Sequence, residues 1–282
     1  MVNKVAILLT TWNSGRYLVE QLDSILNQTY KNWELYIRDD CSTDDTPHLL
    51  AVYEKKDNRV HVLPDTRKRG AKDGFMWLLE QVEADFYMFC DHDDVWLSTK
   101  IENSLQCILS QADIDTTPLI VGTDMCVVDA ELRLIAASYW KRQHYALSLC
   151  HNKWFHLVYN NVAGCTMLFN RTARDLALPC PSEAQLHDSW LACSVLWKGG
   201  RILPLEQPSL LYRQHQKNAV GAHRVPSYFS QLRKIKTLWR KTHREWKAVS
   251  GIADVGFVYF LMVKLYYMVI LHWHDFKNNV HR

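Results

Sequence analysis

FYMFCDHDD, residues 86–94, joins an apolar run to a cluster of acids. The run Phe86–Cys90 is typical of a strand that is covered on both faces of a parallel sheet. A strand that ends in Asp91, Asp93 and Asp94 puts three carboxylates at the carboxyl edge of the sheet, where open α/β folds bind ligands. Close carboxylates repel each other, so one interpretation is a divalent cation bridging a diphosphate. The other is a polar turn in which Asp94 or Ser98 caps the next helix.

Strand and helix patterns alternate ahead of this stretch. Apolar runs predict strands, and apolar residues at helical spacing predict helices between them. The resulting order, βαβαβαβ, predicts a parallel, doubly wound sheet with right-handed crossovers. Neither GxGxxG nor GxxxxGK[ST] occurs, which argues against the usual nicotinamide or flavin site and against a P-loop. The predicted strands are 5–11, 33–38, 60–63 and 86–90, and the predicted helices are 16–28, one starting at 46, and 74–83.

Composition limits the class of protein. A chain of 282 residues with 48% hydrophobic residues is long enough for one large domain, or for one domain with an appendage. Its eight cysteines are scattered without a CxxC pair, which favours buried, reduced thiols over disulfides or zinc. Because the chain opens without an apolar stretch and cleavage site, we expect no secretory signal and a cytoplasmic protein.

Charge is unevenly distributed along the chain. Residues 227–282 hold ten Lys/Arg and three Asp/Glu, a net charge of +7, so the remaining residues 1–226 carry −4 of the total of +3. This basic excess predicts an acidic surface as the partner of the tail and no nucleic-acid partner.

The tail itself contains two helical patterns. Residues 232–247 interleave basic and apolar side chains and predict a basic amphipathic helix. Residues 255–271 are nearly all apolar, but the run is short for a membrane span and has Lys264 near its middle. We expect association with the membrane interface, and the alternative is that both helices pack on the domain. Whether the tail spans the bilayer or lies on it stays open.

Five motifs together resemble glycosyltransferase family 2, and the third to fifth resemble its bacterial rhamnosyltransferase-like branch. In the order of the chain they are VAILLTTWN (5–13), IRDDCSTDDT (37–46), FCDHDDVWLSTKIE (89–102), LHDSWLA (186–192) and LYRQHQKNAVG (211–221). The resemblance implies a GT-A fold, which is Rossmann-like with a mostly parallel sheet and helices on both faces. It also implies an inverting transfer of a sugar from a nucleotide diphosphate sugar.

The resemblance divides the chain into parts. Residues 1–226 are expected to form the GT-A domain, with a nucleotide-binding half at about 1–100 and an acceptor half at about 101–226. Residues 227–282 form a C-terminal helical extension.

Donor residues follow from the motif matches. Thr11 and one of Asp39 or Asp40 are expected to contact the base, since a carboxylate accepts the imide N–H of uracil or thymine. Asn13 ends the first strand at the same edge. Cys41 stands where the family usually has Gly, which puts the backbone angle of this loop in question because Gly tolerates positive φ. Turn chemistry is the structural alternative for the two acids.

The acidic stretch is expected to hold the ribose and the metal. The resemblance places Asp91 against the ribose and near the metal, Asp93 on Mg²⁺ or Mn²⁺, and Asp94 on either the metal or the sugar. His215 is a further candidate ligand, and Arg213 is a candidate bidentate partner of the diphosphate. The cation would neutralise the leaving nucleoside diphosphate.

Asp188 is the predicted catalytic base. The family motif gives this Asp that role, and an inverting displacement needs one carboxylate to take the proton of the acceptor hydroxyl. Its place at a helix start also suits the helix dipole, which is a purely structural explanation. His187 and Trp190 are predicted to bind the acceptor, although Trp at helical spacing also suits a core.

A segment near residue 70 completes the predicted donor site. Gly70, Lys72 and Asp73 lie where relatives approach the donor sugar and diphosphate.

The predicted reaction is one step in bacterial surface polysaccharide synthesis, such as O-antigen or capsule. The donor would be dTDP-rhamnose or a UDP-hexose such as UDP-galactose. The acceptor would be a glycan or an undecaprenyl-diphosphate-linked sugar at the inner face of the cell membrane, where the tail would hold the protein peripherally. The alternatives are a metal-dependent nucleotidyltransferase or phosphotransferase, and a non-catalytic membrane-bound module.

Overall fold

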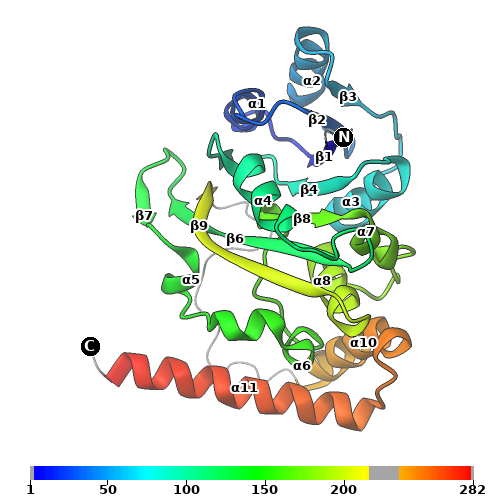
Figure 1. Cartoon of the computed structure of the whole chain (residues 1–282), viewed down its shortest axis with the longest axis vertical. Helices are drawn as coiled ribbons and strands as arrows, with labels where there is room; N and C mark the ends of the chain where they lie inside the picture. Colours follow the sequence, from blue (N-terminus) through cyan, green and yellow to red (C-terminus); the bar gives the residue numbers. More distant parts are fainter. Residues whose placement is uncertain (1–2, 216–234, 281–282) are drawn as a thin grey trace.

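A nine-stranded mixed sheet forms the centre of the protein in a computed structural model that describes residues 3–215 and 235–280 (Figure 1). Along the sheet the strands follow the order β3-β2-β1-β4-β8-β6-β9-β5, and β7 pairs with β6. The strands are β1 (Val5–Thr11), β2 (Trp33–Asp39), β3 (Val60–Val62), β4 (Phe86–Cys90), β5 (Val95–Trp96), β6 (Leu119–Val128), β7 (Leu134–Ala136), β8 (Met167–Asn170) and β9 (Arg201–Arg213).

The first half of the sheet is parallel, as the sequence predicts. β1 pairs with β2 and β4, and β2 pairs with β3, all in parallel register. The predicted crossover helices are present, although the third begins at Gly70 instead of Gly74. They are α1 (Leu18–Leu26), α2 (Thr46–Lys56) and α3 (Gly70–Gln81).

The second half of the sheet is mixed. β8 lies antiparallel to both β4 and β6, and β9 runs parallel to β6 with register shifts near Asp124. The strand patterns did not predict β5, β7 or β9. The helical elements of this half are α4 (Lys100–Leu109), α5 (Tyr139–Arg142), η1 (Leu147–His151), α6 (Lys153–His156), η2 (Gly164–Thr166), α7 (Arg171–Ala177) and α8 (His187–Trp197).

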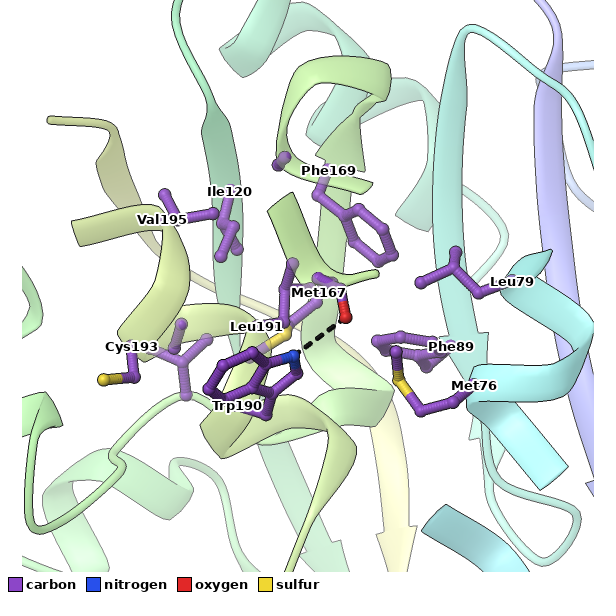
Figure 2. Packing of buried hydrophobic residues seen from close by; sticks show 14 of the residues in the cluster. Met76, Leu79, Phe89, Ile120, Met167, Phe169, Trp190, Leu191, Cys193 and Val195 are labelled. Carbon is purple, nitrogen blue, oxygen red and sulfur yellow. Dashed lines mark hydrogen bonds between the residues drawn. The ribbon is translucent and has the colours of Figure 1, made fainter. Parts of the chain in front are cut away.

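Helices cover both faces of the sheet and create two apolar cores. On one face α1, α2 and α4 share a buried cluster with apolar residues of β1, β2, β4 and β6, and the helices contribute residues such as Leu22, Leu50 and Ile101. On the other face α3, α7 and α8 pack on β4, β6 and β8, where Met76 and Leu191 are among the buried residues (Figure 2). Strand residues alternate between the two cores, as a sheet covered on both faces requires.

Two helices follow the residues that are not described. α10 (Ile235–Ala253) packs against α8, and α11 (Phe257–Val280) packs against α6. Lys264, in the apolar run, forms an ion pair with Glu245 of α10, so its charge is turned toward the protein. The expected domain boundary at residue 226 lies outside the described residues.

Within the described part of the chain, no single helix has the length and apolar character of a membrane span. One bent pair, Leu238–Ala253 with Phe257–Leu271, meets that test by length and composition, and its two helices meet at 110°.

Trp190 provides a test of the core. Its side chain is 6% exposed, and its indole N–H donates to the carbonyl of Ala177 at 2.8 Å (Figure 2). Trp190→Ala should therefore lower the free energy of unfolding by about 3–5 kcal/mol in urea titrations. Trp239→Ala, at a position that is 55% exposed, is the control and should change it by about 0.5 kcal/mol or less. Equal effects of the two substitutions would contradict this placement of Trp190.

Candidate donor-binding and acidic site

The carboxyl ends of β1, β2 and β4 bring the first predicted residues together. Thr11 is the register partner of Asp39, and Leu9 is the partner of Cys90. Because parallel strands end at the same edge, the loops after these strands lie side by side. This edge is where the predicted donor residues gather.

Asp39 is held by the loop that follows it. Its carboxylate accepts hydrogen bonds from the Thr11 hydroxyl at 2.8 Å, the Ser42 hydroxyl at 2.6 Å and the Ser42 backbone N–H at 2.8 Å. The Asn13 side-chain oxygen accepts from the Thr43 backbone N–H at 2.8 Å. Thr11 and Asn13 therefore orient the loop and Asp39, whose side chain is partly exposed.

Asp40 has a different environment and a structural role. It is 5% exposed and accepts from the Arg38 guanidinium at 2.7 Å and from the backbone N–H groups of Arg69 and Gly70 at 2.6 and 3.0 Å. Burial raises its pKa, but these three donors outweigh burial and hold the pKa below its usual value. The pair of alternatives for the base contact is thereby narrowed to Asp39, since Asp40 faces the protein.

Gly70 and Lys72 lie in the first turn of α3. Gly70 has φ +75°, a conformation that L side chains rarely adopt, and its N–H fixes it to Asp40. The ammonium of Lys72 pairs with Asp73 at 2.8 Å.

Cys41 keeps the left-handed backbone that Gly would provide in the family loop. Its φ is +60°, a conformation that costs a non-glycine residue about 1–2 kcal/mol. Cys41 therefore adopts the positive φ that the sequence analysis put in question, and the loop keeps its shape although Cys stands where the family usually has Gly.

Trp12 is an exposed aromatic side chain at this edge that the motif analysis did not assign. It is 52% exposed, and the Lys68 ammonium lies 4.7 Å from its ring centroid. It directly follows Thr11, so it lies in the turn that leaves β1 at this edge of the sheet. The sequence feature that could have identified Trp12 is its position in the turn after a strand, where a large aromatic side chain need not be buried.

The acids after β4 form a crowded group. Ligand atoms of Asp91, Asp94 and Cys165 all lie within 4.8 Å of one another. Burial, and next the charges of Asp93 and Asp188, raise the pKa of Asp91 to about 7. Burial, and next the charges of Asp93 and Asp91, raise the pKa of Asp94 well above its usual range. Cys165 had no assigned role in the sequence because it lies far from the acidic motif.

This group suits a hard divalent cation. One oxygen of Asp94, Oδ2, is buried and has no hydrogen-bond partner among the described residues. Such an atom is costly unless a cation or proton compensates it. Carboxylate oxygens are the ligands that Mg²⁺ and Mn²⁺ prefer, whereas the Cys165 thiol, whose pKa burial raises, stays protonated and binds such ions poorly.

Asp93 and His215 form a separate pair beside this group. Asp93 Oδ2 and His215 Nε2 are 2.8 Å apart, and the His215 ring lies 4.9 Å from the ring of Tyr17. Asp91, Asp93 and His215 were predicted to bind the metal together. In the structure Asp91 lies close to Asp94, and Asp93 pairs with His215. The rest of the motif that ends at residue 221 lies outside the described residues.

Arg213 has a different environment from the one expected of a diphosphate ligand. Its guanidinium is buried and donates to the carbonyls of Asp93 and Ala130 at 2.8 and 2.7 Å and to the Glu20 carboxylate. Its backbone N–H donates to Asp94 at 3.1 Å. Arg213 therefore fixes the acidic loop to the end of β9, and the sequence expectation is corrected to a positioning role.

Lys100 lies in the third motif, which gave it no role, and it is buried near the acids. It is 1% exposed, and its ammonium donates to the Cys165 carbonyl and the Ser209 hydroxyl, both at 2.9 Å. Burial lowers its pKa to about 8. The buried cation sits close enough to Asp94 for the two charges to attract each other.

Asp188 reaches the same group from α8. It lies in the first turn of that helix, and its Oδ2 accepts from the backbone N–H of Gly164 at 3.0 Å. A Cβ at Gly164 would come within 2.7 Å of the His187 ring, so a residue without a side chain is needed for this approach. Gly164 directly precedes Cys165, whose thiol lies within 4.8 Å of the Asp91 and Asp94 carboxylates, so α8 and β4 converge on one site.

His187 and Trp190 belong to the core, so the expectation that they bind an acceptor is corrected. The His187 ring lies 4.3 Å from the ring of Phe75 and 4.5 Å from that of Phe89, and burial lowers its pKa. Trp190 packs among apolar residues on the same side of the sheet (Figure 2). Both side chains support α8 and do not line an open surface.

Residues 6–176, more than half of the chain, match the sequence pattern of glycosyl transferase family 2. The chain belongs to this family. The membership makes it a glycosyltransferase, as the motifs implied.

Relatives support the same assignment. The chain is 33% identical over 108 residues to a putative teichuronic acid biosynthesis glycosyltransferase, TuaG, of Bacillus subtilis, covering 38% of this chain and 43% of TuaG. It is 25% identical over 263 residues to the dTDP-rhamnosyl transferase RfbG of Shigella flexneri, covering 89% and 86% of the two chains. The chain thus spans less than half of the first relative and most of the second.

Solved structures show the same fold. The structure of S. aureus TarS 1-349 in complex with UDP-GlcNAc superposes with a TM-score of 0.61 at 17% identity, covering 93% of this chain and 70% of that one. The mannosyltransferase PcManGT of Pyrobaculum calidifontis, in complex with GDP-Man and Mn²⁺, gives 0.60 at 17% identity, covering 97% and 72%. The predicted GT-A fold with a C-terminal helical extension is confirmed.

The raised pKa of Asp91 gives a pH dependence with a defined sign. Without divalent ions, native Asp91 keeps its proton up to about pH 7, whereas the unfolded chain releases it near its ordinary value of about 4. The native state therefore binds more protons in this window, and the free energy of unfolding should fall as the pH rises from 4 to 7. Urea titrations at several pH values, in buffer that contains EDTA, measure this change in the free energy of unfolding.

Matched variants isolate the group responsible. Asp91→Asn should reduce the slope of the free energy of unfolding against pH between pH 4 and 7. Asp115→Asn, at an exposed position, should leave this slope unchanged. Mn²⁺ should stabilise the parent protein more at pH 7.5 than at pH 5, since protons compete with the ion. An unaltered slope in Asp91→Asn would contradict the assignment.

Proposed function

We propose that the protein is an inverting, metal-dependent glycosyltransferase that uses a UDP- or dTDP-linked sugar and acts in bacterial surface polysaccharide synthesis. The observation that carries this proposal is the convergence of Asp188, from α8, on the acids that follow β4. A base on one side and a diphosphate-binding edge on the other are the two parts that an inverting transfer needs.

The nucleotide end of the donor fits the edge formed by β1 and β2. Asp39 is oriented by Thr11 and Ser42, and its carboxylate suits the imide N–H of uracil or thymine. The exposed ring of Trp12, in the turn that follows β1, offers a flat apolar surface for the base. RfbG, matched along most of its length, is named a dTDP-rhamnosyl transferase, which favours dTDP-rhamnose, and UDP-hexoses such as UDP-galactose are the second choice.

The metal would be held by the acids after β4. Asp91, Asp93 and Asp94 supply carboxylate oxygens, and His215 is the remaining candidate ligand. When bound, Mg²⁺ or Mn²⁺ neutralises charge on the departing diphosphate. Arg213 helps to position this group by donating to the Asp93 carbonyl, and Lys100 does so by donating to the Cys165 carbonyl.

Asp188 would act as the base. Its carboxylate is held by the Gly164 and Ser189 backbone N–H groups at 3.0 and 2.6 Å, which fixes its direction. The acceptor hydroxyl would give its proton to this carboxylate while its oxygen attacks C1 of the sugar from the face opposite the leaving diphosphate. One such step inverts the anomeric centre without an enzyme nucleophile.

The acceptor is proposed to be a glycan or a sugar on undecaprenyl diphosphate. Two relatives from Escherichia coli carry the name UDP-Glc:alpha-D-GlcNAc-diphosphoundecaprenol beta-1,3-glucosyltransferase, and one of them matches 90% of this chain at 24% identity. Such an acceptor would place the protein peripherally at the inner face of the cell membrane.

A donor panel tests the proposal. Purified protein with UDP- and dTDP-sugars should release nucleoside diphosphate from one donor preferentially, and EDTA should reduce that release at least about 100-fold, with recovery in Mn²⁺. Release of pyrophosphate would instead indicate a nucleotidyltransferase. Absence of turnover with every donor, including in the presence of a lipid-linked acceptor, would leave a non-catalytic module.

Asp188→Asn tests the base. The amide cannot take a proton but keeps the size of the side chain, so transfer should fall about 10²- to 10⁴-fold while the affinity for the nucleoside diphosphate stays within about twofold. Calorimetric titration measures the affinity and product formation measures the rate. The matched control is Asp175→Asn, at an exposed position on α7, which should keep both the transfer rate and the affinity for the nucleoside diphosphate. A full rate in Asp188→Asn would show that another group is the base.

A further inference from the structure

The outer face of α11 is an apolar surface without a partner among the described residues. Val258, Met262, Leu265 and Val269 recur at helical spacing and are 70%, 54%, 46% and 64% exposed. The opposite face of the helix packs on the protein, where Phe260 is fully buried and the Tyr267 ring lies 5.4 Å from that of Phe155. Contiguous apolar surface of this kind marks an interaction site.

A basic hollow lies next to this surface. It has a volume of about 630 Å³ and is lined by one face of α10 and by the loop before α8. Its lining residues are Ser182, Glu183, Trp239, Arg240, His243, Arg244 and Lys247. Three Lys/Arg against one acid make it a site for an anion, and the Trp239 indole adds an apolar wall.

The hollow and the apolar face are continuous. The Trp239 ring lies 5.0 Å from the ring of Phe257, the residue directly before Val258. Figure 1 shows α10 and α11 together at the end of the molecule opposite α2, with α11 along its outer edge. One flat partner can therefore touch both.

We propose that the outer face of α11 and the basic hollow of α10 form a docking surface for an anionic lipid bilayer, with a lipid phosphate in the hollow. Apolar side chains that enter the headgroup boundary beside Lys/Arg residues are the combination that holds interfacial helices on anionic membranes. This deepens the proposed function by naming the surface and the lipid chemistry of its membrane partner.

The position of the hollow connects docking to the acceptor. The Arg244 guanidinium donates to the Ser182 carbonyl at 3.2 Å, and the Gln185 amide donates to Glu245 at 3.2 Å. These contacts attach α10 to the loop that leads into Asp188. A protein docked in this way presents the loop ahead of its proposed base to the membrane, where a lipid-linked acceptor is held.

Vesicle sedimentation of the full chain tests the surface. The protein should pellet with vesicles of phosphatidylcholine and phosphatidylglycerol (7:3) and remain in solution with phosphatidylcholine alone. Arg240→Glu/Arg244→Glu should weaken binding roughly twentyfold or more, at roughly fivefold for each lost basic residue. Met262→Asp/Val269→Asp should weaken it at least about tenfold, because two buried apolar contacts are lost.

Control variants separate this result from general charge and folding effects. Lys55→Glu/Lys198→Glu makes the same change in net charge at exposed positions elsewhere, and Val52→Asp introduces an acid on exposed α2; both should bind vesicles with at most a fewfold change. Release of nucleoside diphosphate should be equal in all variants, which confirms folding. If no donor is turned over, the proposed function fails while the vesicle result stands by itself.

Any one of four outcomes would overturn the proposal. Equal binding by the α11 variant and the parent would remove the apolar face from the surface, and a change from dimer to monomer in that variant would assign the face to a second copy of the chain. Equal binding to both vesicle types, or no effect of the α10 variant, would show that the hollow takes no lipid phosphate.

Discussion

Repulsion among four carboxylates is the constraint on which the arrangement of this protein depends. Asp91, Asp93 and Asp94 follow one strand, and Asp188 arrives from a helix on the other side of the site. The raised pKa values of Asp91 and Asp94 express the cost of this crowding. A stable fold would avoid such a group, so its presence points to a cationic partner that the reaction supplies.

The surrounding structure holds the acids in place without neutralising them. Arg213, at the end of β9, contacts the Asp93 carbonyl and the Asp94 carboxylate, and Lys100, at the start of α4, contacts the Cys165 carbonyl. These contacts join segments that are far apart in the chain. The half of the sheet that contains β6, β8 and β9 is therefore needed to shape an edge whose acids come from the first half.

The first half of the fold follows from local patterns, and the second half does so only in part: the stretches 119–128 and 166–169 predict β6 and β8, whereas β5, β7 and β9 were not predicted. β1 to β4 are apolar runs with clear ends, and the sequence predicts them closely. β9 was missed because Pro204, Pro208 and Glu206 interrupt it, and a proline ordinarily argues against a paired strand. The register shifts near Asp124, opposite Pro208, show how the sheet accommodates the interruption.

The site shows the same division between local and distant information. The motifs indicated Asp39 and Asp40 together, but only the Arg69 and Gly70 N–H groups, about thirty residues away, show that Asp40 faces the protein. His187 stood beside the proposed base and was assigned to the acceptor, yet the rings that enclose it come from α3 and β4. Cys165 lies outside every motif, and Lys100 lies within the third motif without an assigned role, since the importance of both arises from their position near the acids.

The C-terminal helices show how one ion pair changes the interpretation of an apolar segment. Lys264 looked like a charge at the worst depth of a hydrophobic run, but it pairs with Glu245 on the inner side of α11. The outer side of the described helix is left with apolar and aromatic exposed residues. The inner side packs on α6, which in turn packs on α8. The surface that we propose for the membrane is thus joined through the packing of α11, α6 and α8 to the helix that carries Asp188, so the proposed docking would orient the proposed base toward the proposed lipid-linked acceptor.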